Sequence, residues 1–130
     1  MQLFVSFYRL MPKSLMHQGI PHSSELLKGT LQTIILKVLK DNEKMYGYEI
    51  TQKVKALSEE RIIITEGALY PALHKMEAEG MLITKTVKVD NRTRKYYSLT
   101  RKGNVEAGNR LKEFIDFILT MGQVLNIQWG

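Results

Sequence analysis

The segment that points most directly to a chemistry is the basic stretch "KVDNRTRKYYSLTRKG", residues 88–103. It holds six of the chain's 19 lysines and arginines and a single acidic residue, Asp90. Positive charges at this density repel one another, and such a cluster is typical of a surface that binds the phosphates of a nucleic acid. The stretch therefore predicts the binding of a polyanion.

The basicity is local, because most of the remaining chain is nearly neutral. Residues 81–103 carry seven basic side chains and one acidic one, whereas residues 24–80 carry eight basic and nine acidic ones. A charged hairpin can also protect a sheet edge from pairing with other molecules. Acidic residues would protect an edge equally well, so the one-sided charge favours a nucleic-acid contact.

A hairpin is expected to position these charges, and helices are expected around it. Residues 81–89 and 93–99 are strand-like and flank a turn at Asp90 and Asn91. Apolar residues at helical spacing predict helices over residues 24–41, 47–58, 66–79 and 101 to near the C-terminus. The β-branched residues 61–64 are expected to be extended or to form a short strand.

Polar residues at the helix ends support these boundaries. Ser24, Thr65 and Thr100 can cap the first, third and last helices, and Gly80 can end the third. Pro71 lies inside the third helix, where its missing N–H is tolerable only near the first turn or with a bend.

The order of elements predicts the fold class. Three short helices, a hairpin and a long helix give a mainly α fold with a small β-hairpin, the layout of a winged helix-turn-helix with a long C-terminal helix. In that fold the third helix lies in the DNA major groove and the hairpin is the wing. We expect residues 1–22 to be a mobile leader, residues 23–100 to be the winged-helix domain and residues 101–130 to be a dimerisation helix.

The predicted DNA-binding residues come from the second helix, the third helix and the wing. They are Tyr46, Tyr48, Thr65, Gly67, Tyr70, His74, Lys75, Lys88, Arg92, Arg94, Lys95 and Tyr96. The wing cations would bind phosphates, and the third helix would contribute register and base contacts. Alternatively, the third helix shows an ordinary solvated face and the two tyrosines of the second helix pack in the core. Glu66 and Glu77 oppose phosphates on that helix unless they read a cytosine amine or form local ion pairs.

The last helix carries an apolar seam with heptad spacing, which predicts a homodimer. The expected interface residues are Leu111, Phe114, Ile115, Ile118, Met121, Gly122 and Leu125. A helix of this length has more apolar surface than a small winged-helix body can cover, and a second copy of the chain is the simplest partner. The alternative is that the helix folds back on the first helix of its own chain.

Other classes of function are disfavoured. The chain has three histidines and no cysteine, and it has no nucleophile motif, phosphate-binding glycine loop or paired carboxylates on one face. We therefore expect no enzyme activity, no cofactor and no metal; His17, His22 and Glu25 have poor spacing for chelation. No apolar run approaches a membrane span, the first residues do not resemble a signal peptide, and the lack of cysteine fits a cytoplasmic protein.

Four stretches, in this order, resemble the PadR family of bacterial transcriptional regulators. They are "LLKGTLQTIILKVL" (26–39), "YGYEI" (46–50), "GALYPALHKMEAEGML" (67–82) and "RKYYSLTRKG" (94–103). The Tyr70-Pro71 pair is shared with the family, which accounts for a proline in the third helix. The resemblance covers most of residues 24–103.

This resemblance implies a dimeric, sequence-specific regulator of transcription that binds double-stranded DNA, usually a repressor relieved by a small phenolic or drug-like ligand. Its shorter members dimerise through a single C-terminal helix, and some bind flat aromatic drugs there with a tryptophan. The expected pocket walls are Phe114, Ile118, Met121, Leu125 and Trp129. The only tryptophan, Trp129, is next to the last residue and so departs from the mid-helix position in those relatives.

The function expected from the sequence is thus a ligand-relieved, homodimeric repressor that binds a palindromic operator. The alternatives are a winged helix that binds an acidic protein partner and a nucleic-acid binder that prefers RNA.

Overall fold

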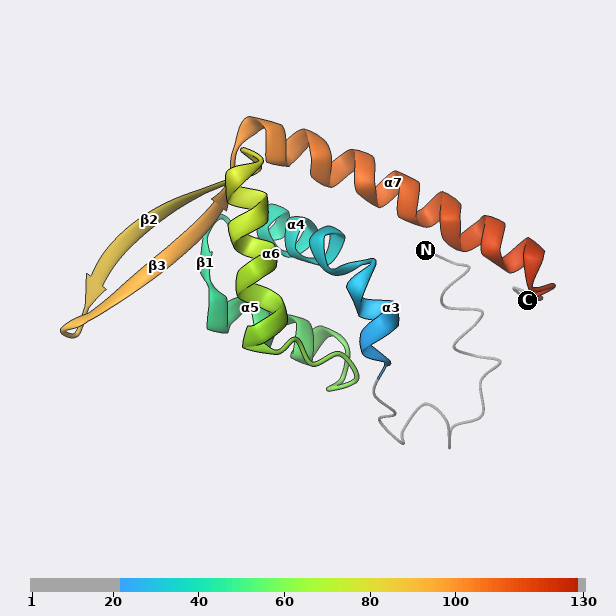
Figure 1. Cartoon of the computed structure of the whole chain (residues 1–130), viewed down its shortest axis with the longest axis horizontal. Coiled ribbons are helices and arrows are strands. Elements are labelled where there is room, and N and C mark those ends of the chain that lie inside the picture. Colours follow the sequence, from blue (N-terminus) through green and yellow to red (C-terminus); the bar gives the residue numbers. More distant parts are fainter. Residues whose placement is uncertain (1–21, 129–130) are drawn as a thin grey trace.

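The computed structural model of the chain describes residues 22–128, so most of the predicted leader and Trp129 lie outside the described residues. The elements are α3 (Ser24–Lys28), α4 (Leu31–Asp41), β1 (Met45–Tyr46), α5 (Gly47–Leu57), α6 (Glu66–Ala78), β2 (Leu82–Val89), β3 (Arg92–Leu99) and α7 (Arg101–Val124). The hairpin of β2 and β3 projects from one end of the helical body, and α7 extends in the opposite direction (Figure 1). The architecture is the predicted winged helix-turn-helix with a long C-terminal helix.

The first predicted helix is wrong in one respect, because it is two helices separated at Gly29 and Thr30. The Thr30 hydroxyl donates to the carbonyls of Leu26 and Leu27, each at 3.2 Å. A side chain that bonds carbonyls in this way competes with the regular helical hydrogen bonds, and glycine is a weak helix former. The cap of α3 is Ser23 rather than Ser24.

The strand prediction needs one addition, and one of its alternatives is excluded. Residues 61–64, expected to be extended or a short strand, form no strand; the Ile62 N–H donates to the Ser58 hydroxyl at 2.9 Å and the Arg61 carbonyl accepts from the His22 N–H at 3.1 Å. The additional strand is β1, which pairs antiparallel with β3 and gives the sheet order β1-β3-β2. The sheet therefore has three strands where the sequence predicted a two-stranded hairpin.

The core lies where α4, α5 and α6 meet the base of the sheet. Its members with no exposed surface are Ile35, Leu36, Ile50, Leu69, Leu73 and Met76. Tyr97, in β3, is the largest of the side chains that are almost fully buried. No polar or charged side chain is buried among residues 22–128. The wing therefore shares the hydrophobic core with the helices only at its base.

The start of α7 is tied to the end of α6. The Thr100 hydroxyl caps α7 by accepting from the Gly103 N–H at 3.0 Å and donates to the Gly80 carbonyl at 2.6 Å. The Lys102 ammonium donates to the Glu79 carbonyl at 2.7 Å. Lys102, counted in the basic stretch, thus satisfies a carbonyl at the C-terminus of α6.

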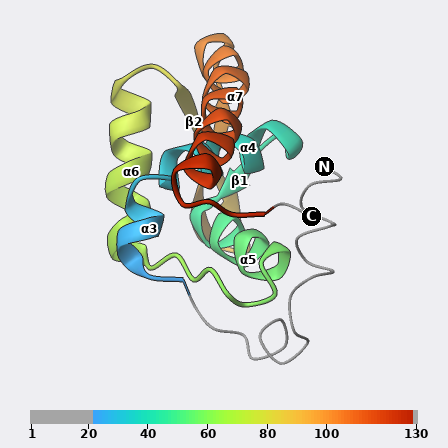
Figure 2. The same ribbon diagram turned by 90° about the vertical axis from the view of Figure 1, so that its right-hand side faces the viewer.

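The first half of α7 packs on α4, and the second half leaves the body (Figures 1 and 2). Ala107 is buried in this contact, and the Arg110 guanidinium donates to the Gln32 amide oxygen at 2.7 Å. Further along, several large apolar side chains are exposed: Ile115, Phe117, Leu119, Val124 and Leu125. At 24 residues, α7 is about 36 Å long. None of the described helices is long and apolar enough to cross a lipid bilayer.

Candidate nucleic-acid interface

Helix α6 presents one buried face and one exposed face. Thr65 caps it, its hydroxyl accepting from the Ala68 N–H at 3.3 Å. The residues on the buried face are Leu69, Leu73 and Met76. The predicted contact residues on the other side are all exposed: Gly67, Tyr70, His74 and Lys75. The boundaries and the capping of this helix agree with the prediction, so it can offer a rigid outward surface.

Pro71 lies in the second turn of α6, and the helix continues past it. A proline there leaves the carbonyl four residues earlier, that of Gly67, without its helical partner. Gly67 is exposed, and apart from its neighbours and the backbone of its own helix no atom lies within 4 Å of the position that a Cβ would take. The unpaired carbonyl is therefore at the surface, where water or a ligand can reach it.

Tyr70 points toward the start of α5 as well as lying at the surface. A Cβ added to Gly47 would lie 2.5 Å from the Tyr70 hydroxyl oxygen, so the phenol end packs directly on this glycine. The residue is 37% exposed. The close contact of Tyr70 with Gly47 sets the distance between α5 and α6, a role that sequence reasoning missed.

The wing turns at Asp90 and Asn91, whose φ angles are 48° and 62°. Two consecutive left-handed residues form the type I′ turn that matches the twist of a tight hairpin, and aspartate and asparagine tolerate that conformation. The register pairs Val89 with Arg92 and Lys88 with Thr93 on either side of the turn. Lys88 and Arg92 therefore lie at the tip of the wing.

The wing cations divide between the two faces of the hairpin. Paired residues share a face and successive residues alternate, so Lys88 and Lys95 lie on the face of the buried Tyr97. Arg92 and Arg94 lie on the opposite face. Because Glu77 of α6 contacts Lys95, the first of these faces is the one turned toward α6.

On the face of the hairpin opposite to Tyr97, the outer face, aromatic rings from β1 and β3 contact two cations. The Arg94 guanidinium lies 4.4 Å from the centre of the Tyr46 ring, and the Lys44 ammonium lies 5.3 Å from that of Tyr96. The two rings meet edge to face, with centroids 5.6 Å apart. Cation–π contacts at exposed sites contribute about 0.5–1 kcal/mol each. Three predicted contact residues thus form one cluster, with Lys44 as a member that the sequence did not single out.

On the face that carries Tyr97 and is turned toward α6, the inner face, Glu77 links α6 to both strands of the wing. Its Oε2 accepts from the Thr84 hydroxyl at 2.9 Å, and its Oε1 lies 3.7 Å from the Lys95 ammonium. The Lys95 ammonium also lies 5.6 Å from the centre of the Tyr97 ring. Burial raises the pKa of the Tyr97 phenol, and the charge of Glu77 and the proximity of Tyr70 raise it further.

The other predicted contact residues are free to meet a ligand. Tyr48, His74, Lys75, Lys88 and Arg92 are exposed, and their side chains make no hydrogen bond or ion pair within residues 22–128. Residues 22–128 include no group of three or more histidines, aspartates or glutamates that could hold a metal ion. The surface is therefore an exposed helix face beside a projecting basic hairpin.

Comparison with known proteins identifies the architecture. The model of the transcriptional regulator PadR-like family matches residues 35–109. The transcriptional regulator Rv3488 of Mycobacterium tuberculosis is 35% identical over 79 residues, which cover 61% of this chain and 70% of that protein.

Solved structures agree with this match. A transcriptional regulator from Clostridium thermocellum superposes with a TM-score of 0.68 at 27% identity, covering 79% of this chain and 96% of its own. A PadR family transcriptional regulator from Eggerthella lenta gives a TM-score of 0.67 at 28% identity, covering 80% and 88%. The family model spans the chain from within α4, through the wing, to the first part of α7. The chain belongs to the PadR-like family of transcriptional regulators, whose members act on transcription and are not enzymes.

Proposed function

We propose that the protein is a homodimeric repressor that binds a palindromic operator in double-stranded DNA and leaves it when a small aromatic ligand binds. The observation that carries DNA binding is the exposed face of α6 beside a wing whose tip cations, Lys88 and Arg92, have no acidic partner in the described part of the chain. Exposed cations without partners are suited to phosphates, and the helix face is suited to a major groove.

In the proposed complex each protomer uses both parts of this surface. The two α6 helices enter successive major grooves about 34–36 Å apart, and the wings lie along the flanking phosphates. Gly67, His74 and Lys75 supply base or phosphate contacts from α6. Tyr70 contributes through its exposed edge and by its packing on Gly47.

The direct test is fluorescence anisotropy of a labelled duplex from upstream of the protein's own gene, against a scrambled duplex, over a series of salt concentrations. A DNA regulator should bind one duplex selectively, and log K should fall linearly with log salt by about 0.9 per phosphate contacted. If genomic DNA selection also yields no bound sequence, DNA regulation is excluded. An RNA duplex as competitor distinguishes a preference for RNA.

Removing the two tip cations should weaken binding to every duplex by a similar factor. In Lys88→Ala/Arg92→Ala we expect the salt slope to fall by about 1.8, because two phosphate contacts are lost. The measurement is the same anisotropy series. As a control, Lys37→Ala/Lys112→Ala removes two cations from α4 and α7 and should leave the slope within error. An unchanged slope in the wing variant would remove the tip from the mechanism.

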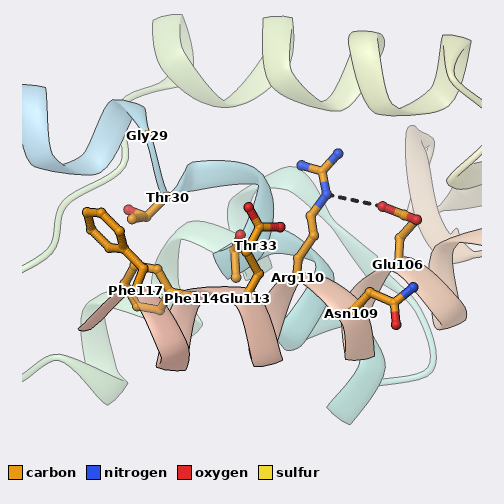
Figure 3. Close-up of a pocket in the computed structure, with 9 residues that line it drawn as sticks. All are labelled: Gly29, Thr30, Thr33, Glu106, Asn109, Arg110, Glu113, Phe114 and Phe117. Carbon is orange, nitrogen blue, oxygen red and sulfur yellow. Dashed lines mark hydrogen bonds and ion pairs between the residues drawn. The ribbon is translucent and has the colours of Figure 1, made fainter. Parts of the chain in front are cut away.

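A crevice between α7 and the junction of α3 with α4 supports the proposed ligand control. It has a volume of about 690 Å³, and its lining includes Phe114, Phe117 and Arg110. Figure 3 shows Phe114 and Phe117 beside Thr30, and Arg110 between Thr33 and its partner Glu106. Two aromatic rings suit a flat aromatic ligand, while the Arg110 guanidinium beside them is already paired with Glu106 at 3.4 Å. Of the predicted pocket walls, Phe114 lines this crevice.

The link between α7 and α6 supports a route from the crevice to the DNA surface. Thr100 and Lys102 bond the carbonyls of Gly80 and Glu79, so the base of α7 is held against the end of α6. A ligand that changes the angle of α7 would then change the position of α6. Its effect on operator affinity is limited to its preference for one arrangement over the other.

Ligand control is tested by release of the operator. A panel of phenolic acids and planar aromatic dyes should include a compound that releases labelled operator in a saturable manner. Phe117→Ala should lose most of that response and keep its ligand-free operator affinity, because Phe117 lines the crevice outside the DNA surface. A response that is identical in this variant would place the ligand elsewhere.

A further inference from the structure

Within residues 22–128, the wing cation Lys95 forms an ion pair with the carboxylate of Glu77. Its two oxygens contact Thr84 in β2 at 2.9 Å and Lys95 in β3 at 3.7 Å. The side chains of Glu77 and Lys95 are 34% and 44% exposed, so the pair lies at the surface, on the side of the wing that faces α6. The same carboxylate therefore braces the wing and partners one of its four predicted phosphate-binding cations.

We propose that Glu77 is a specificity-determining residue, which lowers affinity for non-operator DNA by withholding Lys95 and by holding the wing at one angle to α6. The proposal rests on the DNA-binding function proposed above. In this proposal Glu77 does not contact a base itself. It affects DNA binding indirectly, through its contacts with Lys95 and Thr84.

Withholding Lys95 reduces the part of the binding that carries no sequence information. Phosphate contacts supply essentially all of the affinity for non-specific DNA, and each adds about 0.9 to the salt slope. An exposed ion pair is itself weak, so it competes with a phosphate on nearly equal terms. Lys95 then binds DNA only where the duplex places a phosphate close enough to outcompete Glu77.

Bracing the wing acts in the same direction. Outside its base, the wing has few contacts with the body, and a hairpin free to tilt could adapt to the phosphates of any duplex. The hydrogen bond from Thr84 and the pair with Lys95 hold the hairpin against α6. The wing is then correctly placed only when α6 is seated in its groove, which is the case on the operator. Selectivity depends on such penalties against wrong partners as well as on contacts to the right one.

Lys88 provides a matched comparison, since it lies on the same face of the hairpin as Lys95. It has no acidic partner in residues 22–128. Lys88 should therefore bind phosphates on operator and scrambled DNA alike. Lys95 should do so on scrambled DNA only after Glu77 has lost its charge.

The test measures operator and scrambled duplex affinities over a salt series for Glu77→Gln, Lys95→Gln and the double variant. A glutamine can still accept from Thr84 but carries no charge for Lys95. We expect Glu77→Gln to bind scrambled DNA about fivefold more tightly, with a slope steeper by about 0.9, and to lose selectivity for the operator. Lys95→Gln as a single substitution should leave the salt slope on scrambled DNA nearly unchanged. In the double variant it should abolish the tighter binding and the steeper slope that Glu77→Gln produces.

Controls separate this role from a general effect on folding. Lys88→Gln should lower the slope by about 0.9 in both backgrounds. Thr84→Val removes the hydrogen bond to Glu77 and leaves the charges of Glu77 and Lys95 in place. It should lower selectivity for the operator without steepening the salt slope on scrambled DNA. Thermal unfolding of each variant checks that the fold is retained.

The inference is overturned if Lys95→Gln lowers the salt slope on scrambled DNA by the same amount in the wild type and in Glu77→Gln. If Glu77→Gln fails to fold, the wild-type background still decides: Lys95→Gln lowering the scrambled-DNA slope as much as Lys88→Gln does would also overturn the inference. If the unchanged protein binds neither duplex in a salt-dependent way, the proposed DNA-binding function fails first, and the two failures are thereby distinguished.

Discussion

Replacing Gly103 by alanine should destabilise the protein by about 3 kcal/mol or prevent it from folding. The added methyl group would collide with the carbonyl oxygen of Met81 and would lie 3.2 Å from a methyl carbon of Leu99. Overpacking in a well-packed interior typically costs about 1–3 kcal/mol, and more when the neighbour cannot move. Here the neighbour is backbone, and the Met81 carbonyl also accepts from the Thr100 N–H at 3.1 Å.

The measurement is urea unfolding followed by circular dichroism, and α7 contains its own control. Gly108 lies five residues further along the same helix, where an added methyl group would have only the Lys40 ammonium near it, at 3.9 Å. Gly108→Ala should therefore stabilise the protein by up to about 1 kcal/mol, the difference in helix propensity. Equal effects of the two substitutions would show that the contact with Met81 does not constrain Gly103.

Much of this fold follows from signals that are close together in the sequence. Thr65 and Thr100 cap α6 and α7 as their types predict, and Gly80, with a φ of 79°, follows α6 in the left-handed conformation expected of glycine there. Asp90 and Asn91 form the turn between two strands of alternating residues. Each of these features depends on neighbours within four residues, and such features can be recognised in a single sequence.

The features that the sequence did not reveal depend on contacts between distant segments. β1 is only two residues long, and it is a strand because Met45 and Tyr46 pair with Tyr97 and Tyr96. The contact of Tyr70 with Gly47 joins residues 23 positions apart, and the pair of Glu77 with Lys95 joins residues 18 apart. Periodicity and capping carry no information about such pairs.

The same limit applies to the candidate DNA surface. Residue type alone placed Arg94 and Lys95 together as phosphate contacts. Alternation along the strand already puts them on opposite faces, but it does not show that Arg94 lies over Tyr46 and that Lys95 meets Glu77. Of the predicted wing cations, Lys88 and Arg92 have no partner within residues 22–128, and both lie at the turn. Their availability could be recognised only once the pairing of the strands was known.

Replacing Ile115 by glutamate should convert the proposed dimer to a monomer and lower operator affinity at least 100-fold. Ile115 belongs to the predicted seam of α7 and is 45% exposed in the single chain, so no contact among residues 22–128 covers it fully. A carboxylate in an apolar interface between two copies would be desolvated without a partner, which costs several kcal/mol. A monomer presents one α6 instead of two linked ones, and the gain from joining two binding events is lost.

Light scattering coupled to gel filtration measures the mass, and anisotropy measures the operator affinity. Thr120→Glu is the matched control, because it adds the same charge to the same helix at an exposed position outside the predicted seam. It should stay dimeric and keep its operator affinity within about threefold, since one distant exposed charge is largely screened. If Ile115→Glu remains a dimer with wild-type affinity, the seam of α7 is not the interface, and the exposed apolar residues of its second half serve another partner.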